Sequence, residues 1–204
     1  MKLFWSSRSP FVRKVMVAAH EVGLADRIRT ERVVVAANKP NPDVMAKNPI
    51  NKIPTLVLDD GSALYDSRVI CEYLDTLHDG PRLIPATGAA RWTALRRQAL
   101  ADGLMETVVL RLGERGRAKE MQSQSHLESY GLKIAAALDR LERERLEPGG
   151  PPDIGEIAIG CALAHLDFRF GAEDWRAGRL QLAAWYAAFA GRPSMRVTEY
   201  ADVY

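Results

Sequence analysis

The order of strand and helix patterns in the first 79 residues restricts the fold most. Short apolar runs at residues 2–5 and 29–35 predict two strands, and the β-branched run Val33-Val34-Val35 is typical of a buried strand. Between them a helix starts at Ser9-Pro10 and ends at Gly23, which are residue types that mark helix boundaries. Because the two strands flank a helical crossover, we expect them to be parallel.

The rest of this region predicts an antiparallel pair. After a loop or short helix at residues 38–42, strands are expected at 55–58 and 62–64, joined by the turn Asp60-Gly61. A helix follows from Asp66-Ser67. The order β-α-β, then β-β-α, describes a small mixed α/β sheet with helices packed on it.

The pattern changes after residue 79. Proline and glycine mark a linker at 80–88, and residues 89–204 contain helical periodicity and no convincing strand. We therefore predict an α/β domain at 1–79 and an all-helical bundle at 89–204. The expected helices are 90–118, 124–147, 154–171 and 178–190.

The charge balance argues against a nucleic-acid-binding protein. The chain has 28 Lys and Arg against 26 Asp and Glu, a net charge of +2. Arginines cluster between Arg82 and Arg117, but Asp102, Glu106 and Glu114 are interleaved with them. We interpret this cluster as solvated helix faces.

The two cysteines, Cys71 and Cys161, lie in apolar-periodic stretches and are expected to be buried free thiols in a reducing compartment. No signal-peptide pattern or 18-residue apolar run is present, so we expect a cytoplasmic protein that binds no membrane. Cys161 and His165 are four residues apart, but two ligands do not make a metal site, and no metal is expected.

Ser9 is the first candidate functional residue. It is a plausible helix N-cap, and its hydroxyl would also lie at the end of a strand, beside the positive end of a helix. There it could donate a hydrogen bond to an anion such as a thiolate. In a thioredoxin-like layout the redox cysteine pair would lie here, but residues 9–12 contain no cysteine, which excludes dithiol exchange at this position.

Two further motifs could complete a pocket for a small zwitterionic peptide. A cis bond before Pro54, which the sequence does not decide, would turn the backbone of Ile53 outward to pair with an extended ligand. Asp66 and Ser67 open a helix, where a carboxylate and an ammonium group could bind. Each motif also has a purely structural explanation, as a strand start and a helix cap.

Segments 4–15, 48–56 and 64–70 together resemble the cytosolic glutathione transferase superfamily, and the resemblance covers essentially the whole chain. It implies a thioredoxin-like N-terminal domain, an all-helical C-terminal domain, glutathione as co-substrate and a homodimer. Ser9 matches the catalytic serine of the serine-type classes, with a context similar to tau, zeta and bacterial members.

The resemblance also assigns roles to other residues. Ile53 and Pro54 match the backbone clamp, and Asp66 and Ser67 match the pair that holds the γ-glutamyl end, although many members have Glu in place of Asp66. Lys52 matches a basic residue that reaches the glycyl carboxylate. The family's capping box reads Asp153-Ile154-Gly155-Glu156 here. Four residues are candidates to line the electrophile pocket, with ordinary core packing as the alternative: Phe11, Met105, Val109 and Leu112.

The expected function is therefore transfer of glutathione to a small hydrophobic electrophile. A free thiol has a pKa of about 8.5, and Ser9 with the helix dipole would stabilise the thiolate. One alternative is a zeta-like isomerase acting on a cis-enone acid, which needs cationic residues in the second pocket, with Arg8, Arg13 and Arg111 available. The other is a non-catalytic interaction protein like the stringent-starvation type.

Overall fold

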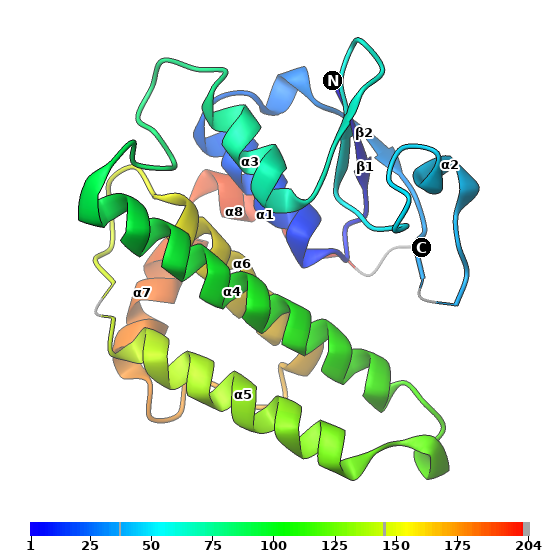
Figure 1. Cartoon of the computed structure of the whole chain (residues 1–204). Coiled ribbons are helices and arrows are strands. Elements are labelled where there is room, and N and C mark those ends of the chain that lie inside the picture. The colour runs from blue at the N-terminus through cyan, green and yellow to red at the C-terminus, as the bar shows by residue number, and fades with distance from the viewer. Residues whose placement is uncertain (37, 145, 202–204) are drawn as a thin grey trace.

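The computed structural model describes residues 1–36, 38–144 and 146–201. A four-stranded sheet in the order β2-β1-β3-β4 forms the N-terminal layer (Figure 1). β1 (Lys2–Trp5) pairs in parallel with β2 (Arg29–Arg32), and antiparallel with β3 (Thr55–Val57), which pairs antiparallel with β4 (Ala63–Leu64). The predicted parallel pair and the predicted hairpin are both confirmed.

The two faces of the sheet pack against different helices. Leu3 and Leu56 face the main core with α1 (Pro10–Glu21) and α3 (Ser67–Asp75). Phe4 alternates to the other face, where it packs with Val44 of the short α2 (Pro42–Met45). A single 3₁₀ turn, Ala25–Arg27, precedes β2. This is a thioredoxin-like arrangement, as the sequence predicts.

The C-terminal half is helical. After α4 (Gly88–Arg115), a 3₁₀ turn at Lys119–Met121 leads into α5 (Gln124–Glu142), and α6 (Ile154–Phe170), α7 (Leu180–Ala190) and α8 (Pro193–Val197) follow. No helix among the described residues is long and apolar enough to cross a membrane.

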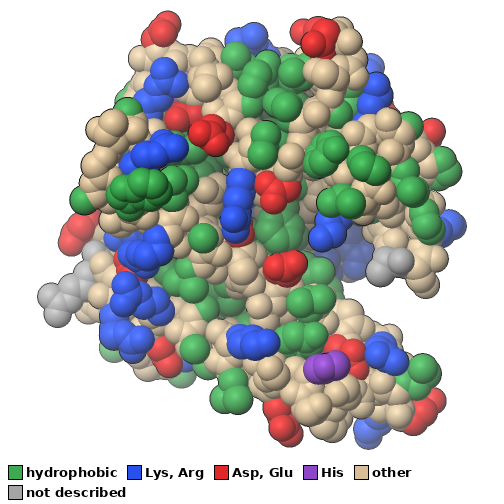
Figure 2. Space-filling view, in the orientation of Figure 1, with side chains coloured by type: hydrophobic (Ala, Val, Ile, Leu, Met, Phe, Trp, Pro, Cys, Tyr) green, Lys and Arg blue, Asp and Glu red, His purple; other side chains and the backbone are tan. Residues whose placement is uncertain are grey.

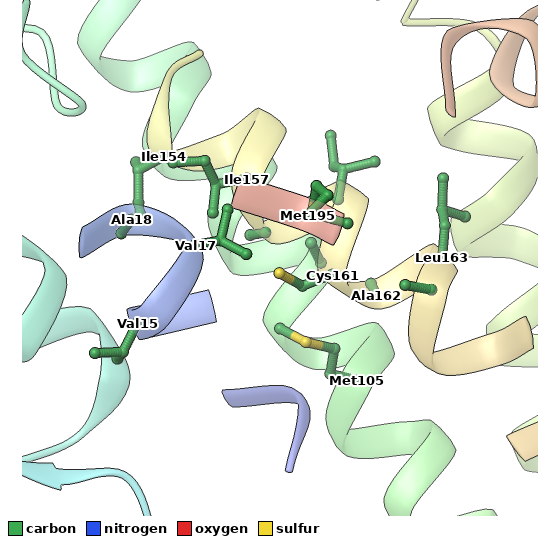
Figure 3. Close-up of a cluster of buried hydrophobic side chains, with 14 of the residues drawn as sticks. Val15, Val17, Ala18, Met105, Ile154, Ile157, Cys161, Ala162, Leu163 and Met195 are labelled. Atoms are coloured by element: carbon green, nitrogen blue, oxygen red, sulfur yellow. The ribbon is translucent and has the colours of Figure 1, made fainter. Parts of the chain in front are cut away.

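Helix α6 is the centre of the molecule, because it is apolar on all sides and buried along most of its length. A Cβ at Gly155 would lie 2.5 Å from Cβ of Arg97 and 2.7 Å from the carbonyl oxygen of Ala94, so only glycine lets α6 approach α4 this closely. Figure 3 shows Val17 of α1, Cys161 of α6 and Met195 of α8 in one cluster. The two halves therefore share a continuous core.

The structure corrects the extent of several predicted elements. β2 ends at Arg32, and the run Val33–Val35 lies outside the strand, with Val34 67% exposed. β2 is an edge strand, and after a last hydrogen bond from Val33 N–H to the carbonyl of Trp5 this run continues into the wall of a cavity. α5 ends at Glu142, five residues before the predicted end, and α8 is not predicted.

Both cysteines are free and fully buried, as predicted. Burial raises the pKa of Cys71 to about 12 and that of Cys161 to about 11. Neither thiol is ionised at neutral pH, so neither is a ready nucleophile.

Candidate functional site

Two adjoining cavities lie between the sheet domain and helix α4. The smaller one, of about 210 Å³, has polar side chains such as Asp66 and Ser67 in its lining, and the larger one, of about 550 Å³, is mostly apolar. Both are lined by Phe11, Lys52, Ile53 and Glu106, so they form one continuous site. Figure 2 shows the surface hollowed on the right, between the sheet domain and the ends of α4 and α5.

Ser9 lies at the wall of the larger cavity and is also the N-cap of α1. The backbone N–H of Val12 donates to Ser9 Oγ at 3.3 Å. A hydroxyl that accepts one hydrogen bond still has its own O–H to donate. The capping role and the proposed thiolate contact are therefore compatible in one side chain.

The Ile53–Pro54 bond is cis, which decides the question that the sequence leaves open. Asn48 holds this loop: its Nδ2 donates to the carbonyl of Lys52 and to Thr55 Oγ1, both at 3.0 Å. Sequence reasoning did not select Asn48, which is almost fully buried. A buried Asn just before an x-Pro strand start is the signal that could have found it.

Asp66 and Ser67 line the smaller cavity at the start of α3. The backbone N–H of Arg68 donates to Asp66 Oδ1 at 2.9 Å, so Asp66 is the N-cap of the helix. Ser67 is the first helical residue and is only 2% exposed. The positive end of α3 thus faces the cavity beside Lys52, a setting that suits a carboxylate.

A buried charged network supports this wall. Asp102 of α4 accepts from Lys14 Nζ of α1 at 2.6 Å and from Arg68 Nε of α3 at 2.7 Å. Lys14 is fully buried, and the hydrogen bond from Asp102 raises the pKa of Arg68. The expectation that Asp102 belongs to a solvated helix face is wrong. The sequence feature that could have predicted its burial is its place among the buried positions of α4, where Ala101 and Met105 flank it.

The apolar wall of the larger cavity comes from both halves of the chain. Phe11, Val109 and Leu112 line it, together with Leu110 and the run Val33–Val35. Met105 is different: it is fully buried and lies in the core near Cys161 (Figure 3), and it is not among the residues that line the cavity. Met105 lies one turn before Val109 on the same face of α4, but at its position α4 packs against the buried helix α6.

The larger cavity also has polar residues that sequence reasoning did not place there. Arg8, Arg32, His165 and Arg169 line it with Lys52 and Glu106. Two of the three arginines considered at the sequence level lie elsewhere. Arg13 donates to the carbonyl of Met195 at 2.8 Å and stacks on Tyr200, and Arg111 pairs with Glu173 at 2.6 Å.

His165 is buried on α6, and no described residue forms a hydrogen bond with its ring nitrogens. Burial, with smaller contributions from Arg169 and Arg13, lowers its pKa to about 3, so the imidazole is neutral at pH 7. Within the described part of the chain, no cluster of three or more His, Cys, Asp or Glu side chains has the proximity to hold a metal ion.

The fold and this site define a class of protein. Family models for the N-terminal and C-terminal domains of glutathione S-transferase match residues 8–77 and 124–188. The chain belongs to the glutathione S-transferase family.

Particular relatives agree with this assignment. The uncharacterised GST-like protein YibF of Escherichia coli K12 is 32% identical over 202 residues, which cover 98% of each chain. The crystal structure of a family member from Pseudomonas fluorescens Pf-5 with bound glutathione is 42% identical, covers 98% of each chain and superposes with a TM-score of 0.93. A second structure from that organism contains S-(propanoic acid)-glutathione, with 42% identity, coverage of 98% of this chain and 99% of that one, and a TM-score of 0.89.

Proposed function

We propose that this protein is a glutathione transferase that activates the thiol of glutathione for attack on a small, largely apolar electrophile. The observation that carries the proposal is the pair of adjoining cavities, one with polar groups for a zwitterionic peptide and one with apolar walls, with Ser9 beside them. The glutathione bound to the 42% identical Pseudomonas fluorescens relative supports the same ligand here.

The smaller cavity holds glutathione in this proposal. Asp66 binds the α-ammonium and Ser67 the α-carboxylate of the γ-glutamyl residue, at the N-terminus of α3. The backbone of Ile53 pairs with the extended peptide, and Lys52 reaches the glycyl carboxylate. Residues 1–79 are thus the glutathione-binding domain, and the helices of 89–204 supply much of the electrophile pocket.

Ser9 acts on the sulfur. Its O–H donates to the thiolate, and the positive end of α1 favours the same negative charge. The thiol loses its proton to solvent, and the sulfur then bonds to the electrophilic carbon. In a substitution the leaving group departs with its electron pair, and in an addition the unsaturated acceptor takes a proton. Phe11, Val109 and Leu112 hold the apolar body of the electrophile.

The first test is retention on immobilised glutathione, followed by thioether formation with a panel of electrophiles. A non-catalytic interaction protein would flow through the column and form no product.

Ser67→Ala separates binding from chemistry, because its contact lies far from the sulfur in the ground state and the transition state alike. We expect a raised KM for glutathione with kcat nearly unchanged.

A glutathione-dependent cis-trans isomerase is the second candidate. The observation that favours it is the cationic lining of the larger cavity by Arg8, Arg32 and Arg169. Such an enzyme adds the glutathione sulfur to a cis-enone acid, allows rotation and eliminates the sulfur again. A cis-enone acid that isomerises with no net loss of glutathione would establish it, whereas accumulation of the thioether would establish the transferase.

A further inference from the structure

We propose that the wall of the larger cavity formed by α6 is a subsite for an anionic oxygen group, such as a carboxylate, on the electrophile. In this subsite His165 donates a hydrogen bond to the oxygen, and Arg169, four residues further along α6, contributes positive charge. The proposal deepens the transferase function and rests on it, because it assigns the chemical class of the second substrate.

The state of the His165 side chain carries the inference. It is 1% exposed and lines the cavity, and both ring nitrogens, Nδ1 and Nε2, have no hydrogen-bond partner among the described residues. Buried polar atoms are normally paired, and an unpaired one is destabilising. The ring is held instead by aromatic contacts, 5.3 Å from Tyr200 and 6.4 Å from Phe168 between centroids. The ring therefore retains one donor and one acceptor that no described residue uses.

The charges around His165 select the kind of partner. The described residues that line this cavity include four cationic side chains, Arg8, Arg32, Lys52 and Arg169, against one carboxylate, Glu106. Each guanidinium has five N–H donors, so an arginine that already has a protein partner retains donors for a ligand. His165 is itself neutral, so it contributes a directed N–H and not a charge. This combination suits an oxygen anion better than a cation or a purely apolar group.

The position of His165 assigns the group to the electrophile and not to glutathione. Asp66 and Ser67, which would bind the γ-glutamyl end of glutathione, line the smaller cavity, whereas His165 lines the larger one. The larger cavity also contains Val109 and Leu112. The substrate that fits has an apolar body beside the sulfur and an acidic group at α6, as in a halogenated or unsaturated carboxylic acid.

The test compares two glutathione thioethers that differ only at the end of the S-substituent. S-(2-carboxyethyl)glutathione has a carboxylate there, and S-propylglutathione has a methyl group. Titration calorimetry gives the Kd of each for the full-length protein. A hydrogen bond to a charged group predicts that the carboxylate conjugate binds at least about 10-fold more tightly. Equal Kd values, or tighter binding of the propyl conjugate, would overturn the inference.

Variants at His165 assign the preference to this side chain. His165→Phe keeps a planar ring but has no ring N–H, so we expect at least a ~10-fold loss for the carboxylate conjugate and little change for the propyl conjugate. His165→Asn restores a donor and part of the preference. Leu112→Met is the control in the same cavity and should affect both conjugates alike. The inference would be overturned if His165→Phe kept the full preference for the carboxylate conjugate. It would also be overturned if that preference were lost in Leu112→Met and not in His165→Phe.

Substrate turnover provides a second measurement that needs no variant. With 3-bromopropanoate the thiolate sulfur bonds to C3, the C–Br bond breaks, and bromide leaves with the electron pair. We expect a kcat/KM at least about 10-fold above that for 1-bromobutane, after correction for the uncatalysed rates. Binding of glutathione without this preference overturns only the subsite. Failure of glutathione and both conjugates to bind overturns the transferase function, and the subsite with it.

Discussion

At the scale of single residues, Ser9 combines a structural and a proposed chemical role in one hydroxyl. Its oxygen accepts from Val12, and we propose that its O–H donates to the thiolate. Ser6 lines the same cavity, whereas Ser7 donates to the carbonyl of Ala201 at 2.8 Å and does not line it. Neighbouring serines therefore provide a natural comparison.

We predict that Ser9→Ala raises the pKa of the bound glutathione thiol by about 1–2 units, because one hydrogen bond to a charged group is worth about 1.5–3 kcal/mol. At neutral pH kcat then falls by roughly 10- to 100-fold, less what the helix dipole still contributes, with little change in glutathione affinity. Thiolate absorbance titrated against pH measures the shift directly.

Ser7→Ala is the matched control and should leave the titration curve in place. Coinciding curves for Ser9→Ala and the unchanged protein would reduce Ser9 to a helix cap. Ser6 would then be the next donor to test, since Arg13 is committed to Met195 and Tyr200.

At the scale of secondary-structure elements, the start of α6 depends on its capping box. Glu156 N–H donates to Asp153 Oδ1 at 2.9 Å, and Asp153 N–H donates to Glu156 Oε2 at 3.0 Å. We predict that Asp153→Ala lowers the stability by about 1 kcal/mol, up to ~2, and lowers Tm, with glutathione affinity of the folded protein unchanged. Asp153→Ser retains a cap acceptor and should recover most of the loss. An unaltered Tm in Asp153→Ala would mean that the box contributes nothing.

The contact between α4 and the end of α5 should depend on pH. Hydrogen bonds from Arg96, then Arg97, lower the pKa of Glu144 from 4.5 to about 2 against the effect of burial. Since the folded pKa lies below the unfolded value, this stabilisation is complete above about pH 4.5 and is lost as the pH falls through about 2.

We therefore predict that Glu144→Gln lowers the free energy of unfolding at pH 7 by about 1–2 kcal/mol, after allowance for water around the half-exposed Arg96. The difference from the unchanged protein should shrink steadily from about pH 4.5 down to about 2. Urea unfolding over this range is the measurement, with Glu128→Gln, an exposed carboxylate on the preceding helix α5, as control. A pH-independent difference would contradict the assignment.

At the scale of the whole molecule, the Lys14–Asp102 pair joins the sheet domain to the helical domain. Asp102→Ala leaves the fully buried Lys14 ammonium with no carboxylate at 2.6 Å, and we predict a loss of about 3–5 kcal/mol in unfolding free energy. The double variant Lys14→Met with Asp102→Leu removes both charges and should recover most of it. If the double variant is no more stable than Asp102→Ala, the cost arises from packing and not from the unpaired charge.

Exposed apolar side chains on two helices bear on the assembly of the whole molecule. We propose a homodimer, supported by the family resemblance and by exposed apolar side chains on α3 and α4, with Val69 45% and Trp92 69% exposed. Sedimentation at micromolar concentration should give twice the mass of one chain. Trp92→Glu should shift the protein toward the monomer, whereas Leu132→Glu, at an equally exposed position on α5, should not. A monomer mass for the unchanged protein would refute the dimer.

Much of this architecture is predictable from local sequence. Several of the predicted features depend only on neighbours a few residues away in the chain. They are the helix start at Ser9-Pro10, the turn Asp60-Gly61 between two apolar runs, and the capping box of Asp153 and Glu156. Caps, turns and periodicity act over that range, so the β3–β4 hairpin and the starts of α1, α3 and α6 are readable in advance. The parallel pairing of β1 and β2 follows from the crossover between them.

Only the tertiary structure decided what lines the site. Val33–Val35 looks like a buried strand and is a cavity wall, Asp102 looks solvated and is buried against a lysine 88 residues away, and Met105 belongs to the core. His165 has an ordinary helical setting in the sequence, and its place in the lining of the same cavity as Ser9 appears only in the tertiary structure. Burial, desolvation and the shape of a cavity are set by elements far apart in the chain, and for that reason no local pattern encodes them.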